Sequence, residues 1–189
     1  MALSVYIVDT GYLLALLDVP GETLAPAGQL PSKRAKRFPP REPSEAEEVE
    51  RRFRKAVASR AEIIVPLAVL YEVASHINDI DGSRQVAKRY ADALLQLVSD
   101  SLSATPASLF QIEPRPELKE FMATLGAFAH DHVLRSHSLV DTALVRLAEA
   151  KKAEGPHREV YIWTWERRRN GIRSCSPDVE AEPFPSWAD

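Results

Sequence analysis

Short apolar runs alternate with helix-like segments along this chain, and this alternation constrains its fold more than any other feature. Residues 5–8 form an apolar run of the kind found in buried strands, and residues 10–18 carry leucines at helical spacing. The other predicted strands are 63–65, 109–112, 160–163 and 172–175. The other predicted helices are 44–60, 66–77, one that opens at Gly82 and Ser83, 116–129, and one that opens at Ser138. Strands that alternate with helices predict an α/β fold in three layers, a central, mainly parallel sheet of four or five strands flanked by helices.

The length and composition fit one domain. The chain has 189 residues, of which 45% are hydrophobic and 27% charged, as in ordinary globular proteins. Residues 19–43 are rich in proline and contain a basic run, so we interpret them as a surface insertion. Residues 178–189 form an acidic tail. We therefore expect a single domain over residues 1–177.

Charge and cysteine content limit the possible partners and compartments. The net charge is −3, so any binding to nucleic acid must come from a local basic patch. The single cysteine, Cys175, cannot form a disulfide within the chain, which favours a reducing compartment. No basic residue precedes the first apolar run, Asp9 interrupts it, and no run is long enough to cross a bilayer. The sequence thus predicts a cytoplasmic protein without a membrane partner.

Four acidic residues follow the predicted strands or begin the adjoining helices. In a parallel α/β sheet the chemistry takes place beyond the carboxyl ends of the strands. Asp9 follows the first predicted strand, and Glu72 lies in the helix after the second strand. Asp141 lies in the first turn of the helix that Ser138 opens. Glu166 follows the fourth predicted strand. Each acid alone is equally well explained as a solvated residue, and Asp141 as a favourable charge at a helix N-terminus. Their joint succession predicts one acidic site.

Four clustered carboxylates repel one another, and a bound divalent cation removes that penalty. Ligands that are all oxygen suit Mg²⁺ or Mn²⁺. Such a site can hold a phosphodiester and activate a water molecule. The carboxylates therefore point to metal-dependent hydrolysis of a phosphodiester.

The order of these motifs resembles the PIN-domain family of ribonucleases. The similar segments are VDTGYLLALL at 8–17, VPLAVLYEV at 65–73, SLVDTA at 138–143, IWTWE at 162–166 and SCSP at 174–177. The resemblance implies a Mg²⁺- or Mn²⁺-dependent endoribonuclease in which Asp9, Glu72 and Asp141 bind the metal and Glu166 completes the site. It also implies that the hydroxyls of Thr10, Ser138 and Thr164 support these carboxylates. Glu166 stands where the family usually has Asp, Thr142 stands where Ala is common, and the insertion is longer than in small members.

Many members of that family are toxins of bacterial toxin–antitoxin pairs. The resemblance therefore implies an RNA substrate, an antitoxin or other protein partner, and a homodimer. Exposed Leu13 or Leu17 on the first helix would fit such contacts. A non-catalytic PIN-like module that binds RNA or protein is the alternative function.

Basic and aromatic residues lie next to the fourth strand. Arg167, Arg168, Arg169 and Arg173 follow Glu166, where they would contact a phosphate backbone or simply form a solvated surface. Trp163 and Trp165 share one face of a strand, and we interpret them as core residues rather than as a base-stacking platform.

Two other site types fit less well. The triplet at residues 9–11, Asp-Thr-Gly, also occurs in aspartic proteases, but these need an all-β chain and a second copy of the triplet. His130, His132 and His137 lack the cysteines and the spacing of a typical zinc site.

Overall fold

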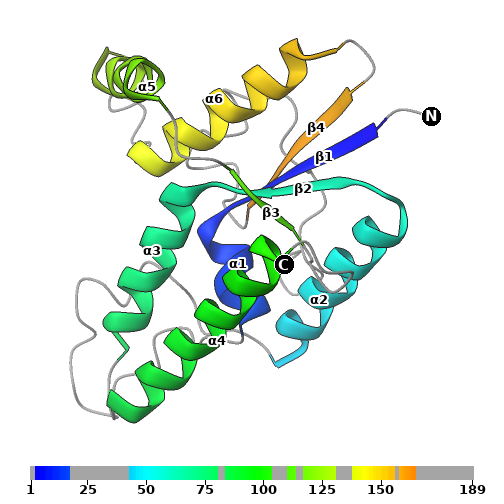
Figure 1. Ribbon diagram of the computed structural model, residues 1–189, viewed down its shortest axis with the longest axis vertical. Helices are drawn as coiled ribbons and strands as arrows, with labels where there is room; N and C mark the ends of the chain where they lie inside the picture. Colours follow the sequence, from blue (N-terminus) through cyan, green and yellow to red (C-terminus); the bar gives the residue numbers. More distant parts are fainter. Residues whose placement is uncertain are drawn as a thin grey trace, which may run out of the picture.

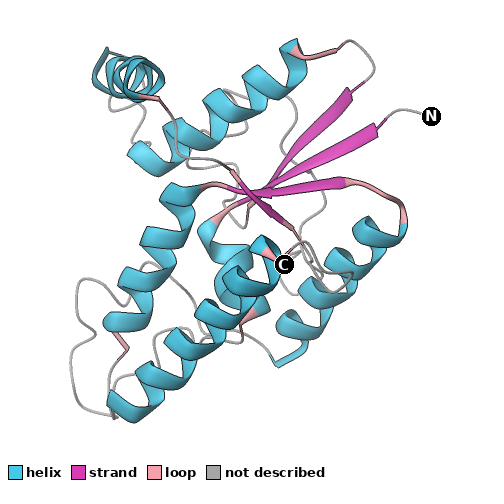
Figure 2. Ribbon diagram, viewed as in Figure 1, coloured by secondary structure: helices cyan, strands magenta, loops and turns pink. Residues whose placement is uncertain are grey.

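A computed structural model describes residues 3–17, 43–80, 84–103, 110–113, 117–130, 138–155 and 158–164. Helices and strands alternate along the chain (Figures 1 and 2). In chain order the elements are β1 (Leu3–Val8), α1 (Thr10–Leu16), α2 (Pro43–Ala58), β2 (Glu62–Val65), α3 (Leu67–Asn78), α4 (Arg84–Leu102), β3 (Gln111–Ile112), α5 (Leu118–His130), α6 (Leu139–Ala153) and β4 (Arg158–Trp163).

The predicted boundaries differ from the observed ones by a few residues. Pro43, assigned to the insertion, is the first residue of α2, a position that suits proline because the first helical N–H needs no partner within the helix. Pro66 precedes α3 as its N-cap instead of lying in its first turn. The rest of the insertion, the predicted strand at 172–175 and the tail at 178–189 lie outside the described residues.

The sheet has four strands in the order β3-β2-β1-β4, all of them parallel, which confirms the predicted fold class. The chain moves outward from β1 through β2 to β3, and then returns to place β4 on the free side of β1. Strand order therefore reverses between β1 and β4. In open α/β sheets a crevice forms at this point, beyond the carboxyl ends of the strands. We call that side of the sheet the carboxyl edge.

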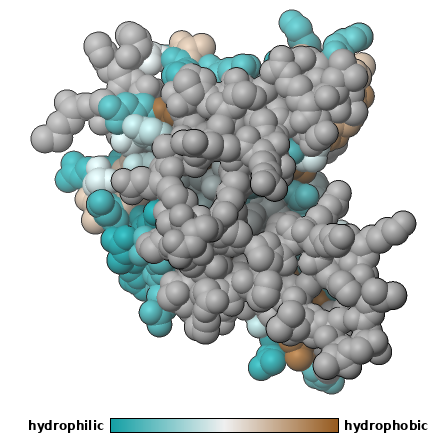
Figure 3. All heavy atoms as spheres, turned by 180° about the vertical axis from the view of Figure 1, so that it is seen from behind, coloured by the Kyte–Doolittle hydropathy of each residue, from teal (hydrophilic) through white to brown (hydrophobic). Residues whose placement is uncertain are grey.

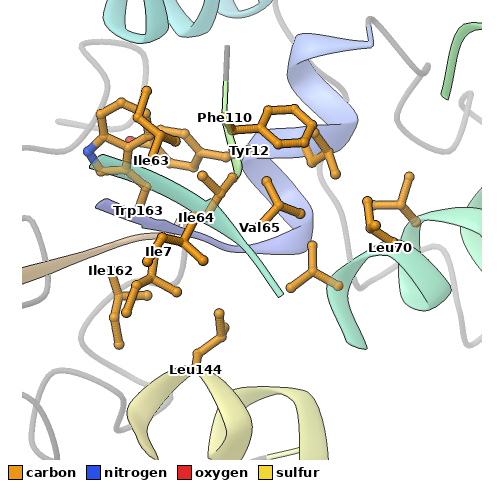
Figure 4. Close-up of a cluster of buried hydrophobic side chains, with 14 of the residues drawn as sticks. Ile7, Tyr12, Ile63, Ile64, Val65, Leu70, Phe110, Leu144, Ile162 and Trp163 are labelled. Atoms are coloured by element: carbon orange, nitrogen blue, oxygen red, sulfur yellow. The ribbon is translucent and has the colours of Figure 1, made fainter. Parts of the chain in front are cut away.

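Helices cover the sheet on both faces and give three layers. Ile7 pairs with Ile64 on one neighbouring strand and with Ile162 on the other, so the three side chains form a row on one face. Leu144 of α6 approaches this row from below in Figure 4, while Tyr12 and Trp163 lie on the opposite face. The core thus has two halves, one on each side of the sheet.

Aromatic rings fill the half of the core that faces α1 and α2. The ring centroid of Trp163 lies 4.4 Å from that of Tyr6, 5.6 Å from that of Tyr12 and 5.1 Å from that of Phe53. Only 2% of Trp163 is exposed, which confirms its predicted role in the core. Large rings contribute much of the apolar area that a small domain can bury. This cluster anchors the carboxyl end of β4 against β1, α1 and α2.

The expectation of an exposed first helix is wrong. Leu13 is fully buried and Leu17 packs partly against the core, because α1 contacts both α2 and α3. Exposed large apolar side chains lie on other helices, and three of them, Leu118, Phe121 and Met122, lie on α5. Of the helices that the structure describes, none combines the length and the apolarity needed to cross a membrane.

Charged residues dominate the outer side of α2. Its arginines pair along the helix with glutamates three or four residues earlier, as Arg51 does with Glu48 and Arg54 with Glu50. Seen from behind, the described residues on the left, where α2 lies in this orientation, form a hydrophilic surface (Figure 3). Since its arginines are already paired with glutamates, α2 offers little net positive charge to a phosphate backbone.

Candidate functional site

Asp9 lies at the carboxyl edge, directly after β1. Its backbone is extended, with φ −83° and ψ 161°, and it caps the N-terminus of α1. Its N–H donates to the carbonyl of Trp163 at 2.9 Å, so the pairing of β1 with β4 continues to this residue. Its Oδ1 accepts a hydrogen bond of 2.6 Å from the N–H of Thr10. The backbone and one carboxylate oxygen of Asp9 are thus held at the point where strand order reverses.

Thr164, the residue after β4, holds the other oxygen of Asp9. Its hydroxyl donates to Oδ2 of Asp9 at 2.6 Å. The two residues are 155 positions apart in the sequence and meet because β1 and β4 are neighbours. Asp9 is 9% exposed, so its carboxylate is desolvated and depends on these donors.

Thr10 connects the first carboxylate with the second. Its hydroxyl donates to Oε2 of Glu72 at 2.6 Å, and Thr10 itself is 4% exposed. Glu72 lies in the second turn of α3, the helix that begins after β2 at the carboxyl edge. Asp9 and Glu72 are therefore held by two threonines, Thr10 and Thr164, both of which the sequence predicted as supporting hydroxyls.

Asp141 lies at the same edge but has a different set of contacts. Helix α6 ends shortly before β4 begins, so its first turn lies near the carboxyl ends of the strands, beside the start of α3 (Figure 1). Oδ2 of Asp141 accepts from the N–H of Ser138 at 2.6 Å, and the hydroxyl of Ser138 accepts from the N–H of Asp141 at 3.0 Å. This capping box stabilises the helix by itself. Ser138 thus supports Asp141 as a helix cap, and Oδ2 of Asp141 is occupied.

Not all of the predicted site residues come together. Within the described residues, no group of three or more acidic, histidine or cysteine side chains is arranged to hold a metal ion. Glu166 and the four arginines at 167, 168, 169 and 173 lie outside the described residues, as do His132 and His137. His130 is exposed at the end of α5. The described part of the site is the pair Asp9 and Glu72, with Asp141 on the neighbouring helix.

The carboxyl edge also favours negative charge through the backbone. Helices α3 and α6 both begin at this edge, and the N-terminus of a helix carries partial positive charge. Hydrogen bonds from hydroxyls to a carboxylate stabilise its ionised form. The edge can therefore keep several carboxylates close together, which is the condition for binding a hard cation through oxygen ligands.

Glu113 is a further acid at this edge that the sequence reasoning missed. It directly follows β3, and its N–H donates to the carbonyl of Val65 at 3.0 Å. Burial raises the pKa of Glu113 above its ordinary value, and the charge of Glu120 raises it further, while Lys151 opposes both. The criterion that identified Asp9, an acid immediately after a strand, also selects Glu113, but the strand before it was a weak prediction.

The chain matches no model of a known protein family, and no curated protein matches it as a relative.

Proposed function

We propose that this protein is a Mg²⁺- or Mn²⁺-dependent endoribonuclease of the PIN type. One observation carries the proposal: two carboxylates, Asp9 and Glu72, are fixed by the hydroxyls of Thr164 and Thr10 at the point where strand order reverses. Enzymes with parallel sheets place their substrates at this point. A buried Asp9 and a half-buried Glu72, both held in place by hydroxyl donors, match a site prepared for a cation better than they match a solvated loop.

The donor set fits a hard cation. Asp9 and Glu72 present only oxygen, as do Asp141 and the predicted Glu166, and this is the ligand type that Mg²⁺ and Mn²⁺ prefer. Within the described residues, Thr10 donates to Oε2 of Glu72 and the N–H of Ser138 donates to Oδ2 of Asp141, whereas Oε1 of Glu72 and Oδ1 of Asp141 accept no hydrogen bond. A bound divalent cation would neutralise phosphate charge and lower the pKa of a coordinated water molecule.

The protein's own residues have positioning roles in this proposal. Thr10 and Thr164 keep the carboxylates in a fixed geometry, so that no reorganisation is needed when the substrate binds. We assign the contacts with the phosphate backbone to Arg167, Arg168, Arg169 and Arg173. RNA is the proposed substrate, the cytoplasm is the proposed location, and a toxin role with an antitoxin partner and a homodimer is part of the same proposal.

The substitution Asp9→Asn tests the proposal. The amide keeps an oxygen for the N–H of Thr10, and its NH₂ can donate to the hydroxyl of Thr164, so the fold should be retained. The lost charge should lower Mn²⁺-dependent RNA cleavage on the order of 10²–10³-fold, the usual effect of losing one well-placed electrostatic group. Cleavage of an oligoribonucleotide is measured in Mn²⁺ and in excess EDTA, and thermal unfolding is recorded for both proteins.

The matched control is Asp92→Asn, an exposed acid of α4 that pairs with Lys88 at 2.6 Å. A surface pair of this kind contributes little, so this variant should cleave like the wild type. Full activity of Asp9→Asn, or equal cleavage by the wild type in EDTA, contradicts the proposed mechanism.

A second function is favoured by one observation. Asp141 forms a capping box with Ser138, which accounts for its position at the start of α6 without a bound metal. A PIN-like module that binds RNA or protein without cleaving would have this arrangement. If the wild type neither binds Mn²⁺ nor cleaves RNA but retains RNA, the binding module is the better description.

A further inference from the structure

A solvent-exposed aromatic side chain lies next to the proposed site. Tyr71 immediately precedes Glu72 in α3 and is 70% exposed. The buried face of α3 is formed by Val69, Leu70, Val73 and Ile77. Successive helical residues are rotated by about 100°, which places Tyr71 on the side of α3 that faces solvent. The fold gains little from its ring, because the ring covers none of the core.

The direction of α3 relates Tyr71 to the carboxyl edge. This helix begins at that edge, next to the first turn of α6 (Figure 1). Long side chains on a helix lean toward its N-terminus, so the ring of Tyr71 leans toward the carboxyl edge. The Cα atoms of Tyr71 and Glu72 are about 3.8 Å apart, as in any trans peptide. A nucleotide whose phosphate lies near Glu72 would therefore have a base within reach of this ring.

We infer that Tyr71 is a substrate-binding residue that stacks on an unpaired base adjacent to the scissile phosphate. The inference rests on the proposed nuclease function and adds a determinant of specificity to the same site. An exposed phenol ring offers a flat apolar face, which suits any base and discriminates little between sequences. The bases of a duplex are already stacked on their neighbours, so they must leave the helix before they can use such a face. Tyr71 thus selects single-stranded over double-stranded RNA.

The experiment compares three variants of the full chain with the wild type. Tyr71→Ala removes the ring, Tyr71→Phe keeps it without the hydroxyl, and Leu95→Ala truncates a similarly exposed apolar side chain on α4, which is 65% exposed. Cleavage of a short single-stranded oligoribonucleotide in Mn²⁺ gives kcat and KM. Binding is followed separately through the fluorescence of a 2-aminopurine base in the same oligoribonucleotide, which is quenched when the base stacks.

We expect Tyr71→Ala to raise KM for the single strand by about 5- to 150-fold with unchanged kcat, the range that corresponds to loss of one base–aromatic stack. The preference for the single strand over a duplex should fall in parallel. Tyr71→Phe and Leu95→Ala should both behave like the wild type. A merely structural role would lower thermal stability in Tyr71→Ala and would not produce a KM effect that phenylalanine rescues.

The outcomes separate this inference from the proposed function. If the wild type cleaves RNA and Tyr71→Ala has the same KM and the same quenching, Tyr71 does not bind the base and the nuclease stands. If the wild type cleaves nothing but quenches 2-aminopurine only when residue 71 is aromatic, the stacking stands and catalysis fails. If the wild type neither cleaves nor quenches, both are overturned.

Discussion

Removal of the Thr10 hydroxyl should loosen the contact between α1 and α3. Thr10→Val keeps the branched shape of the side chain but deletes the donor that lies 2.6 Å from Oε2 of Glu72. Hydrogen bonds to charged groups contribute about 1.5–3 kcal/mol, and valine offers Oε2 of Glu72 no replacement donor. Glu72 is only half-buried, so water replaces part of the lost interaction. We therefore expect a loss of about 1–2 kcal/mol in the free energy of unfolding.

The chain provides a matched control in Thr142→Val. Thr142 is also fully buried, but its hydroxyl donates at 3.0 Å to the carbonyl of Ser138, which already accepts from the N–H of Thr142 at 3.0 Å. Deleting this second donor leaves the acceptor satisfied and involves no charged group. The control should therefore lose less than about 1 kcal/mol.

Both variants are unfolded in urea without metal, and the transition is followed by tryptophan fluorescence, to which the buried Trp163 contributes. The Thr10→Val midpoint should fall below that of Thr142→Val with an unchanged urea dependence. Equal stabilities of the two variants, or of Thr10→Val and the wild type, would show that the link between Thr10 and Glu72 does not stabilise the fold.

Two further substitutions test the raised pKa of Glu113 and the left-handed backbone conformation of Arg60. Burial and the charge of Glu120 raise the pKa of Glu113 above its ordinary value of 4.5, so the folded state keeps this proton to a higher pH than the unfolded state does. The free energy of unfolding is therefore highest below the unfolded pKa and falls as the pH rises from the unfolded pKa through the folded one. Glu113→Gln should lack this fall in a pH series of urea unfolding, whereas the exposed control Glu149→Gln should keep it. Arg60 lies two residues after the end of α2 and has φ 59°, a left-handed conformation that glycine adopts without strain, so Arg60→Gly should stabilise the protein by about 0.5–1 kcal/mol. Arg60→Ala retains the strain, and a gain as large as that of Arg60→Gly would show that φ is not the cause.

The sequence predicted the fold well where periodicity and burial agree. Residues 5–8 and 160–163 are apolar on both sides of the strand, as central parallel strands must be, and they became the β1–β4 pair. The cap of α6 was also readable, because a serine followed three residues later by an acid is a local signal.

The sequence predictions that failed concern contacts between segments that are far apart in the sequence. Leu13 or Leu17 was expected on the surface because exposed apolar residues there would fit a dimer or an antitoxin contact, and only the packing of α2 and α3 around α1 shows that Leu13 is buried. The roles of the site residues were equally hidden. Sequence alone could not show that the hydroxyl of Thr10 donates to Glu72, since the donor and acceptor lie 62 positions apart.

The 155-residue separation between Asp9 and Thr164 has a consequence for the synthesis of this chain. The ribosome releases β1 early and β4 late, and in the sheet that forms, β1 has only β2 beside it until β4 arrives. Until Thr164 has emerged, Oδ2 of Asp9 lacks its hydroxyl donor, and one flank of β1 is open to other chains. Pairings this distant in sequence are also slow to form. The contact between Asp9 and Thr164, and with it the pairing of β1 with β4, therefore forms only after β4 has been synthesised.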